Sequence, residues 1–178
     1  MLVLAGIIVL HITTIILLLV ATIDNAWWIT DTVSTDLWGR LELTNSIWHY
    51  TNLKDYPAGQ ENPAVKNRAV MIRALTVTEY LQTIQATSVL ACIFAILALF
   101  VFVAQLFTLP KGQRFIFTGI LQLIACLSIM IAASIYTAQL HTGDTVGGYG
   151  HCYILAWISF VLTFLLAVTY LVLRKKSE

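Results

Sequence analysis

Cysteine and histidine are the side chains of this sequence that could act as nucleophiles, general bases or metal ligands. The sequence holds three cysteines and no C-x-x-C pair: Cys92, Cys126 and Cys152. It holds four histidines without metal-ligand spacing: His11, His49, His141 and His151. No glycine-rich phosphate loop accompanies them, so the residues do not assemble a recognisable cofactor site.

The adjacent pair His151-Cys152 comes closest to a catalytic arrangement. A cysteine nucleophile needs a base within reach and an electropositive setting. Neighbouring side chains on one helix point about 100° apart, which prevents this pair from meeting. We interpret the cysteines as structural and predict no catalytic residues, no bound metal, no cofactor and no nucleic-acid partner.

Composition then defines the class of protein. The 178 residues are 59% hydrophobic and 11% charged, with a mean hydropathy of +0.84, so a bilayer must serve as the solvent. Four apolar runs have the length of about 20 residues that one span requires: 2–23, 84–109, 115–138 and 152–173. Runs of this length without alternation favour helices. The sequence predicts a single domain over residues 1–178, an all-α transmembrane four-helix bundle.

Basic residues predict the orientation of these spans. Lys111 and Arg114 lie in the short turn 110–114, and Arg174, Lys175 and Lys176 lie in the tail 174–178. By the positive-inside rule, both termini are predicted to be cytoplasmic. Lys175 and Lys176 also resemble a dilysine signal for retrieval to the endoplasmic reticulum, but we favour simple membrane anchoring and a plasma-membrane location.

The predicted outer loops span residues 24–83 and 139–151. Alternating residues in 27–53 favour antiparallel strands, and residues 54–64 are rich in turn formers. Helical spacing returns after Pro63 and predicts an amphipathic extension of the second helix. Trp27 and Trp28 are predicted to anchor the first helix at the outer membrane interface.

Small and polar residues within the spans indicate how the helices pack. Small residues at close spacing form two predicted packing seams: Ala91, Ala95 and Ala98 in the second helix, and Ser159, Thr163 and Ala167 in the fourth. The fourth-helix seam could instead serve a second copy or a partner. Three polar residues are predicted to make contacts between helices: His11, Gln105 and Gln122. The spans lack Asp, Glu, Lys and Arg, which argues against a transporter or pump.

Several ordered blocks closely resemble one family. They include "MLVLAGIIVLHIT", "ATIDNAWW", "TDLW", "FVFVAQLFTLPKGQRF" and "YGHCYILAW", which are similar to the epithelial membrane protein and peripheral myelin protein family of the claudin-like tetraspan superfamily. The resemblance implies a four-helix bundle bearing a small extracellular antiparallel β-sheet, with no enzymatic activity.

The resemblance also implies a function in organising membranes. Members of the family affect the trafficking of integrins and other surface proteins, lipid domains, adhesion and membrane apposition. The implied partners are the lipid bilayer and other integral membrane proteins, or further copies in a homo-oligomer. Two alternatives remain open: a claudin-like adhesion or paracellular barrier protein, and an auxiliary subunit of a channel.

The outer loop departs from the superfamily pattern. That pattern places Leu-Trp before two cysteines that join neighbouring strands, whereas Leu37-Trp38 here precedes Gly39-Arg40-Leu41-Glu42. The loop also lacks an N-x-S/T acceptor, so no N-glycosylation is expected. We predict that Trp38 and Trp48 pack across strands in place of the disulfide, and that Trp38, Trp48 and Tyr50 form a recognition surface.

Overall fold

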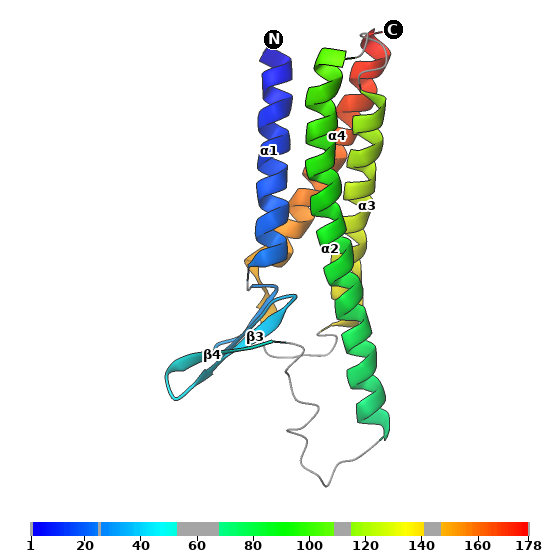
Figure 1. The fold of residues 1–178 in the computed structure, drawn as a ribbon. Helices are drawn as coiled ribbons and strands as arrows, with labels where there is room; N and C mark the ends of the chain where they lie inside the picture. The colour runs from blue at the N-terminus through cyan, green and yellow to red at the C-terminus, as the bar shows by residue number, and fades with distance from the viewer. Residues whose placement is uncertain (1, 25, 53–67, 109–114, 141–146, 178) are drawn as a thin grey trace.

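The computed structural model describes residues 2–24, 26–52, 68–108, 115–140 and 147–177 (Figure 1). Four long helices run along one another: α1 (Leu2–Ile23), α2 (Arg68–Thr108), α3 (Ile116–Gln139) and α4 (His151–Ser177). α1 packs against α2 and α4, and α3 packs against the same two helices. The chain termini lie at one end of the bundle, here named the terminal end, and the β-sheet lies at the other, the sheet end.

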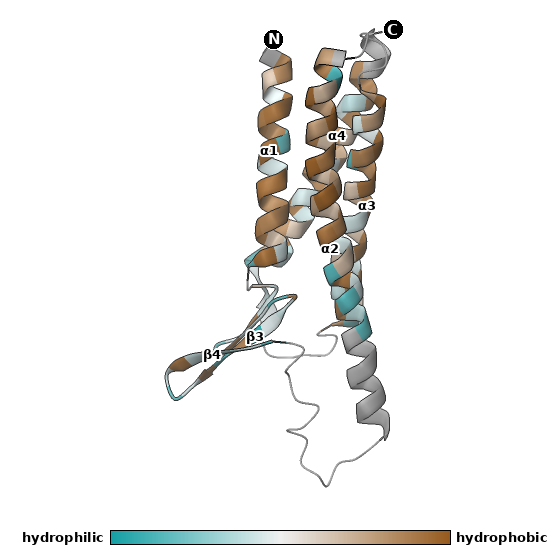
Figure 2. Ribbon diagram, in the orientation of Figure 1, coloured by the Kyte–Doolittle hydropathy of each residue, from teal (hydrophilic) through white to brown (hydrophobic). Residues whose placement is uncertain are grey.

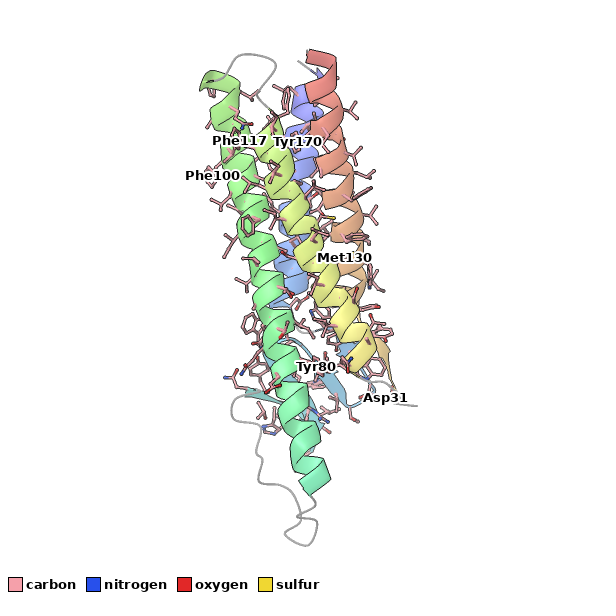
Figure 3. The ribbon with its side chains drawn as sticks, turned by 90° about the vertical axis from the view of Figure 1, so that its right-hand side faces the viewer. Asp31, Tyr80, Phe100, Phe117, Met130 and Tyr170 are labelled. Carbon is pink, nitrogen blue, oxygen red and sulfur yellow. The ribbon has the colours of Figure 1, made fainter. Side chains whose placement is uncertain are left out.

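Hydrophobic residues predominate along most of the length of the four helices (Figure 2). Each helix contains a segment long and apolar enough to cross a bilayer: Val3–Ile23, Glu79–Phe107, Ile116–Gln139 and His151–Leu173. Large apolar side chains such as Phe100 and Phe117 are 68% and 60% exposed (Figure 3). The chain is therefore a multi-pass membrane protein, and the predicted tetraspan bundle with a small antiparallel sheet is confirmed.

Helix α2 is much longer than the span within it. It begins at Arg68, whereas the predicted span begins near residue 84. The helical spacing after Pro63 anticipated this extension, and the predicted turn-rich segment 54–64 lies outside the described residues. The extended helix continues past the other helices at the sheet end (Figure 1).

A five-stranded sheet joins the two connections at the sheet end. Its strands are antiparallel neighbours in the order β4-β3-β2-β1-β5: β1 (Trp28–Ile29), β2 (Val33–Thr35), β3 (Gly39–Thr44), β4 (Ile47–Asn52) and β5 (Gly148–Tyr149). The first four strands confirm the strands predicted in residues 27–53. β5 comes from the α3–α4 connection, so pairing with β1 ties the two connections together.

The β3–β4 hairpin closes through a two-residue turn. Asn45 and Ser46 have φ angles of 52° and 64°, and Thr44 pairs with Ile47 across the turn. Two consecutive positive φ values match the type I′ geometry, whose twist suits a β-hairpin. Asn tolerates the left-handed conformation better than most residues do, which explains its place here.

The two tryptophans at the end of α1 are core residues. Trp27 has no exposed surface, its indole N–H donates to the Ala21 carbonyl at 2.7 Å, and its ring centroid lies 4.8 Å from that of Tyr136. Trp28 is 8% exposed and packs edge-on against Tyr149. The prediction that they anchor the protein at the membrane interface is wrong, because Trp27 is buried against Tyr136 of α3 and Tyr153 of α4, and Trp28 is buried within β1 against Tyr149 of β5.

Both predicted seams of small residues lie inside the bundle. All six members are fully buried: Ala91, Ala95, Ala98, Ser159, Thr163 and Ala167. Small side chains allow close backbone approach in lipid, where hydrophobicity does not drive helix association. Since the α4 seam is covered by its own chain, the alternative that it receives a second copy or a partner is wrong.

His11 connects three of the four helices through its imidazole ring. Its Nε2 lies 3.0 Å from the Ala95 carbonyl of α2, and its Nδ1 lies 2.9 Å from the Tyr170 hydroxyl of α4. A carbonyl only accepts, so Nε2 carries the hydrogen and Nδ1 of the neutral ring accepts the hydroxyl proton. The ring is fully buried, which makes these bonds costly to lose.

The two glutamines differ in their partners. Gln105 Oε1 accepts a hydrogen bond from the Thr118 hydroxyl at 2.8 Å, which joins α2 to α3. Gln122 is fully buried, and its side-chain amide has no hydrogen-bond partner among the residues described.

We expect His11 and Tyr170 to be energetically coupled. In a double-mutant cycle of His11→Ala and Tyr170→Phe, the coupling should be about 0.6 kcal/mol, the average found for hydrogen bonds between transmembrane helices, and should not exceed about 1.7 kcal/mol, the largest value found. Unfolding of the purified protein in mixed micelles measures it.

Thr13→Ala is the matched control for this cycle. Thr13 is exposed and bonds only within its own helix, to the Val9 carbonyl. It should show no coupling to Tyr170. A His11–Tyr170 coupling near zero would contradict the assigned bond.

Candidate recognition surface

The sheet is attached to the bundle by the segment Thr35–Trp38, here named the TDLW joint. Leu37 is fully buried in the helical core. The Trp38 indole N–H donates to the Thr22 carbonyl of α1 at 2.7 Å, and the Gln85 side-chain amide of α2 donates to the Leu37 carbonyl. The joint therefore bonds to two helices at once.

A buried carboxylate organises the TDLW joint. Asp36 is 4% exposed, and its Oδ1 accepts the backbone N–H groups of Trp38, at 2.6 Å, and Gly39. Its Oδ2 accepts a bond from the Tyr50 hydroxyl at 3.4 Å. Burial raises the pKa of Asp36, and the bonds from Gly39, Trp38 and Tyr50 oppose that rise.

Tyr50 ties the hairpin to this carboxylate. Its ring crosses over Gly39, where a β-carbon would collide with the ring and with the Thr51 carbonyl. Glycine therefore allows Tyr50 to reach Asp36 from β4. Burial raises the pKa of the Tyr50 hydroxyl, and the nearby Asp36 raises it further.

The outer part of the β3–β4 hairpin is exposed. β4 is an edge strand of the sheet, and the hairpin projects away from the helices (Figure 1). Ile47, Trp48 and Tyr50 are 60%, 50% and 48% exposed. An edge strand presents unpaired backbone groups, so β4 offers both apolar side chains and main-chain bonding groups.

The three residues predicted for recognition occupy two places. Trp48 and Tyr50 lie on one face of the exposed strand, opposite Leu43 and Leu41 of β3. Trp38 lies at the root of the sheet, bonded to α1. The predicted cross-strand packing is wrong for Trp38, which lies before β3, whereas the register places Trp48 directly across from Leu43 of β3.

The residues that hold the joint were not predicted from the sequence. Asp36, Thr22 and Gln85 were assigned no role, although Asp36 precedes the amides of Trp38 and Gly39 at the spacing of an Asx turn. That spacing was an available signal for Asp36. Thr22 acts through its backbone carbonyl and Gln85 lies 48 residues from Leu37, so neither leaves a local pattern.

The bundle, the projecting sheet and the TDLW joint can be compared with known proteins. The PMP-22/EMP/MP20/Claudin family model matches residues 1–170. The chain belongs to this family. Epithelial membrane protein 2 of Pan troglodytes and of Danio rerio are each 40% identical, and epithelial membrane protein 1 of Homo sapiens is 38% identical. The alignments cover 97–98% of this chain and 98% of each relative.

Membership places the chain among non-enzymatic membrane proteins. The resemblance stated from the sequence blocks is confirmed. The cysteine-free outer loop therefore occurs in a chain that otherwise matches epithelial membrane proteins along almost its whole length.

We expect Asp36→Ala to destabilise the sheet by about 1–3 kcal/mol, because it leaves the buried N–H groups of Trp38 and Gly39 without an acceptor. Asp36→Asn keeps an acceptor oxygen and should cost less. Hydrogen exchange of the β3–β4 amides in micelles measures both effects. Equal loss of protection in the two variants would contradict the acceptor role.

The same residue should give the sheet a pH dependence. Because the folded pKa lies above the unfolded value, the folded state takes up protons more readily. Its stability is greatest below the unfolded pKa and declines as pH rises through the folded pKa. Asp36→Asn should flatten this decline in a pH series of the same exchange measurement.

Proposed function

We propose that this protein organises partner membrane proteins and membrane domains, with the β3–β4 hairpin as its recognition surface. The observation that carries the proposal is the half-exposed Trp48 on β4, which is an edge strand of the sheet formed by the described residues. The hairpin is rooted in the bundle by the TDLW joint, so the surface is held in place before any partner arrives. Integrins are the partner class that the family resemblance implies.

The proposed orientation follows from the basic residues of the sequence. Both termini lie in the cytoplasm, since the short 110–114 turn and the 174–178 tail carry five basic residues between them: Lys111, Arg114, Arg174, Lys175 and Lys176. The sheet then projects outside the cell from a plasma membrane. In this orientation the hairpin meets the outer domains of neighbouring proteins.

Recognition by this hairpin would combine two physical contributions. An edge strand can add main-chain hydrogen bonds to an extended segment of a partner. Tryptophan is enriched among the residues that dominate binding energy, each costing about 2 kcal/mol or more on truncation. Trp48 can supply this contribution because half of its surface is open.

Adhesion between cells is the second candidate function. The feature that favours it is the projection of the hairpin away from the helices (Figure 1). Such a hairpin could pair with the same surface across an intercellular gap. The absence of cysteine from the outer loop, where the superfamily pattern implies a disulfide, counts against it.

We expect Trp48→Ala to weaken the binding of a surface partner by about thirtyfold, the equivalent of 2 kcal/mol. The measurement is quantitative co-isolation of crosslinked integrins from cells that display equal amounts of each variant. His49→Ala is the matched control, since His49 is exposed on the opposite face of the same strand and should have little effect. Undiminished recovery with Trp48→Ala would contradict the proposed surface.

Co-culture of expressing and non-expressing cells separates the two candidate functions. Lateral organisation predicts equal surface signal at every type of contact. Enrichment only where both cells express the protein would favour adhesion and overturn the leading proposal. A terminal epitope tag should be detected only after permeabilisation if the proposed orientation is correct.

A further inference from the structure

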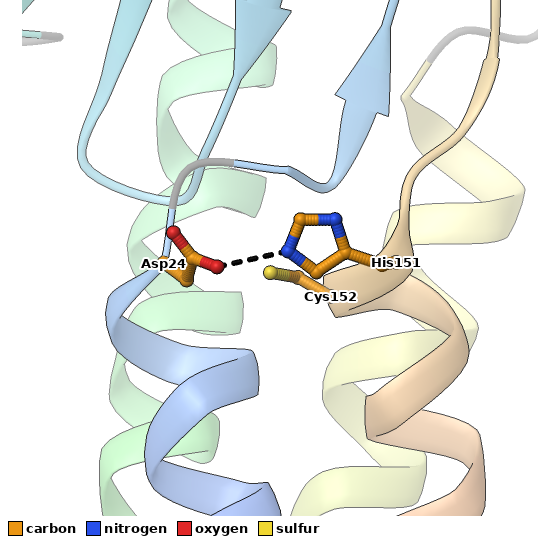
Figure 4. Close-up of side chains that lie close together, drawn as sticks. All are labelled: Asp24, His151 and Cys152. Carbon is orange, nitrogen blue, oxygen red and sulfur yellow. Dashed lines mark hydrogen bonds and ion pairs between the residues drawn. The ribbon is translucent and has the colours of Figure 1, made fainter.

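Three potential metal ligands converge where α1 ends and α4 begins (Figure 4). The His151 Nε2 lies 2.8 Å from the Asp24 Oδ2. The carboxylate oxygen of Asp24, the imidazole nitrogen of His151 and the thiol sulfur of Cys152 all lie within 4.8 Å of one another. In the sequence His151-Cys152 is an isolated pair, because Asp24 lies 127 residues away from His151 along the chain.

Backbone hydrogen bonds hold these three residues together. The Gly150 N–H donates to the Trp27 carbonyl at 2.9 Å, and the Cys152 N–H donates to the Ala26 carbonyl at 3.0 Å. A β-carbon on Gly150 would collide with the Ala26 backbone, so glycine permits this approach. The cluster is thus formed by the fold itself, next to the pairing of β1 with β5.

We propose that Asp24, His151 and Cys152 bind a zinc-like divalent cation. Thiolate, imidazole and carboxylate are the ligands of Zn²⁺ in proteins, whereas Ca²⁺ and Mg²⁺ prefer oxygen alone. Bonds of about 2.0–2.3 Å in a tetrahedral site place ligand atoms about 3.5 Å apart. The three ligand atoms, which all lie within 4.8 Å of one another, are already close to that spacing.

The exposure of the cluster suits a three-ligand site. The side chains of His151 and Asp24 are 58% and 52% exposed, while Cys152 is buried. The cation reaches the site from the solvent side and contacts sulfur on the protein side. Water fills the fourth position, as in other sites with three protein ligands.

Binding changes the protons of two ligands. The Cys152 thiol loses its proton to solvent and binds as the thiolate. The neutral His151 ring moves its hydrogen to Nδ1, which frees Nε2 from its bond to Asp24 for the cation. The Asp24 carboxylate then faces a positive ion in place of the imidazole N–H.

The bound cation would link the end of α1 to the start of α4. It would reinforce the β1–β5 margin of the sheet, opposite the β3–β4 hairpin at the other edge. Binding to the folded state alone would stabilise that state. This role is independent of the partner-binding role proposed for the hairpin.

Cobalt binding to the full-length chain in micelles tests the site. The background variant Cys92→Ala/Cys126→Ala leaves Cys152 as the only cysteine of the chain. We expect one equivalent of Co²⁺ to produce a thiolate-to-cobalt charge-transfer band that Zn²⁺ displaces. Cys152→Ser should remove the band.

The other two ligands give independent variants. Asp24→Asn and His151→Ala should each weaken cobalt binding by at least about tenfold, the lower end of the loss seen even for residues that only support ligands. His49→Ala is the control and should leave binding unchanged. Circular dichroism and gel filtration establish that each variant is folded.

Two results would overturn the proposal. One is the absence of the charge-transfer band in the folded background variant. The other is unchanged cobalt affinity in Asp24→Asn or in His151→Ala, which would indicate binding by the thiol without a three-ligand site. The side chains of Asp24 and His151 are about half exposed, so Asp24→Asn and His151→Ala should fold. These two variants therefore test the site even if Cys152→Ser fails to fold.

Discussion

The placement of the sheet depends on the buried carboxylate of Asp36. A single side chain satisfies the amides of Trp38 and Gly39 and receives the Tyr50 hydroxyl. Those bonds fix the turn that inserts Leu37 into the helical core and presents Trp38 to α1. Burial of a charge is costly unless the charged group is hydrogen-bonded. Loss of any one of the three bonds to Asp36 should therefore destabilise the whole joint.

The helices obey a different constraint, set by the lipid. Lipid tails are as apolar as leucine side chains, so the hydrophobic effect does not drive the helices together. Their association requires close packing and hydrogen bonds instead. The buried alanines of α2 and the small residues of α4 provide the first. His11 provides the second, because its two ring nitrogens bond to α2 and α4. The presence of this polar side chain inside the membrane is therefore explained by its two hydrogen bonds between helices.

The sequence predicted what short-range patterns determine. Span length fixes the number of helices, and small residues at close spacing fix the seams, so both could be read directly. The burial of Trp27 could not be predicted, because an aromatic residue at a helix end suits either the membrane interface or a core covered by other elements. Contacts distant in sequence were also beyond reach: Asp24 meets His151, and Gln85 meets Leu37, only after the sheet has folded onto the bundle.

The outer loop lacks the two cysteines that the resemblance to the superfamily implies, and the hairpin is held at its root instead. A disulfide would join two strands directly, whereas here six residue pairs of β3 and β4 extend from a fixed joint. The type I′ turn at Asn45 and Ser46 and the Tyr50–Asp36 bond order both ends of the ladder. A surface that is already ordered loses less conformational entropy when it binds a partner. Trp48 can therefore remain open to a partner, since the contacts that hold the hairpin lie elsewhere.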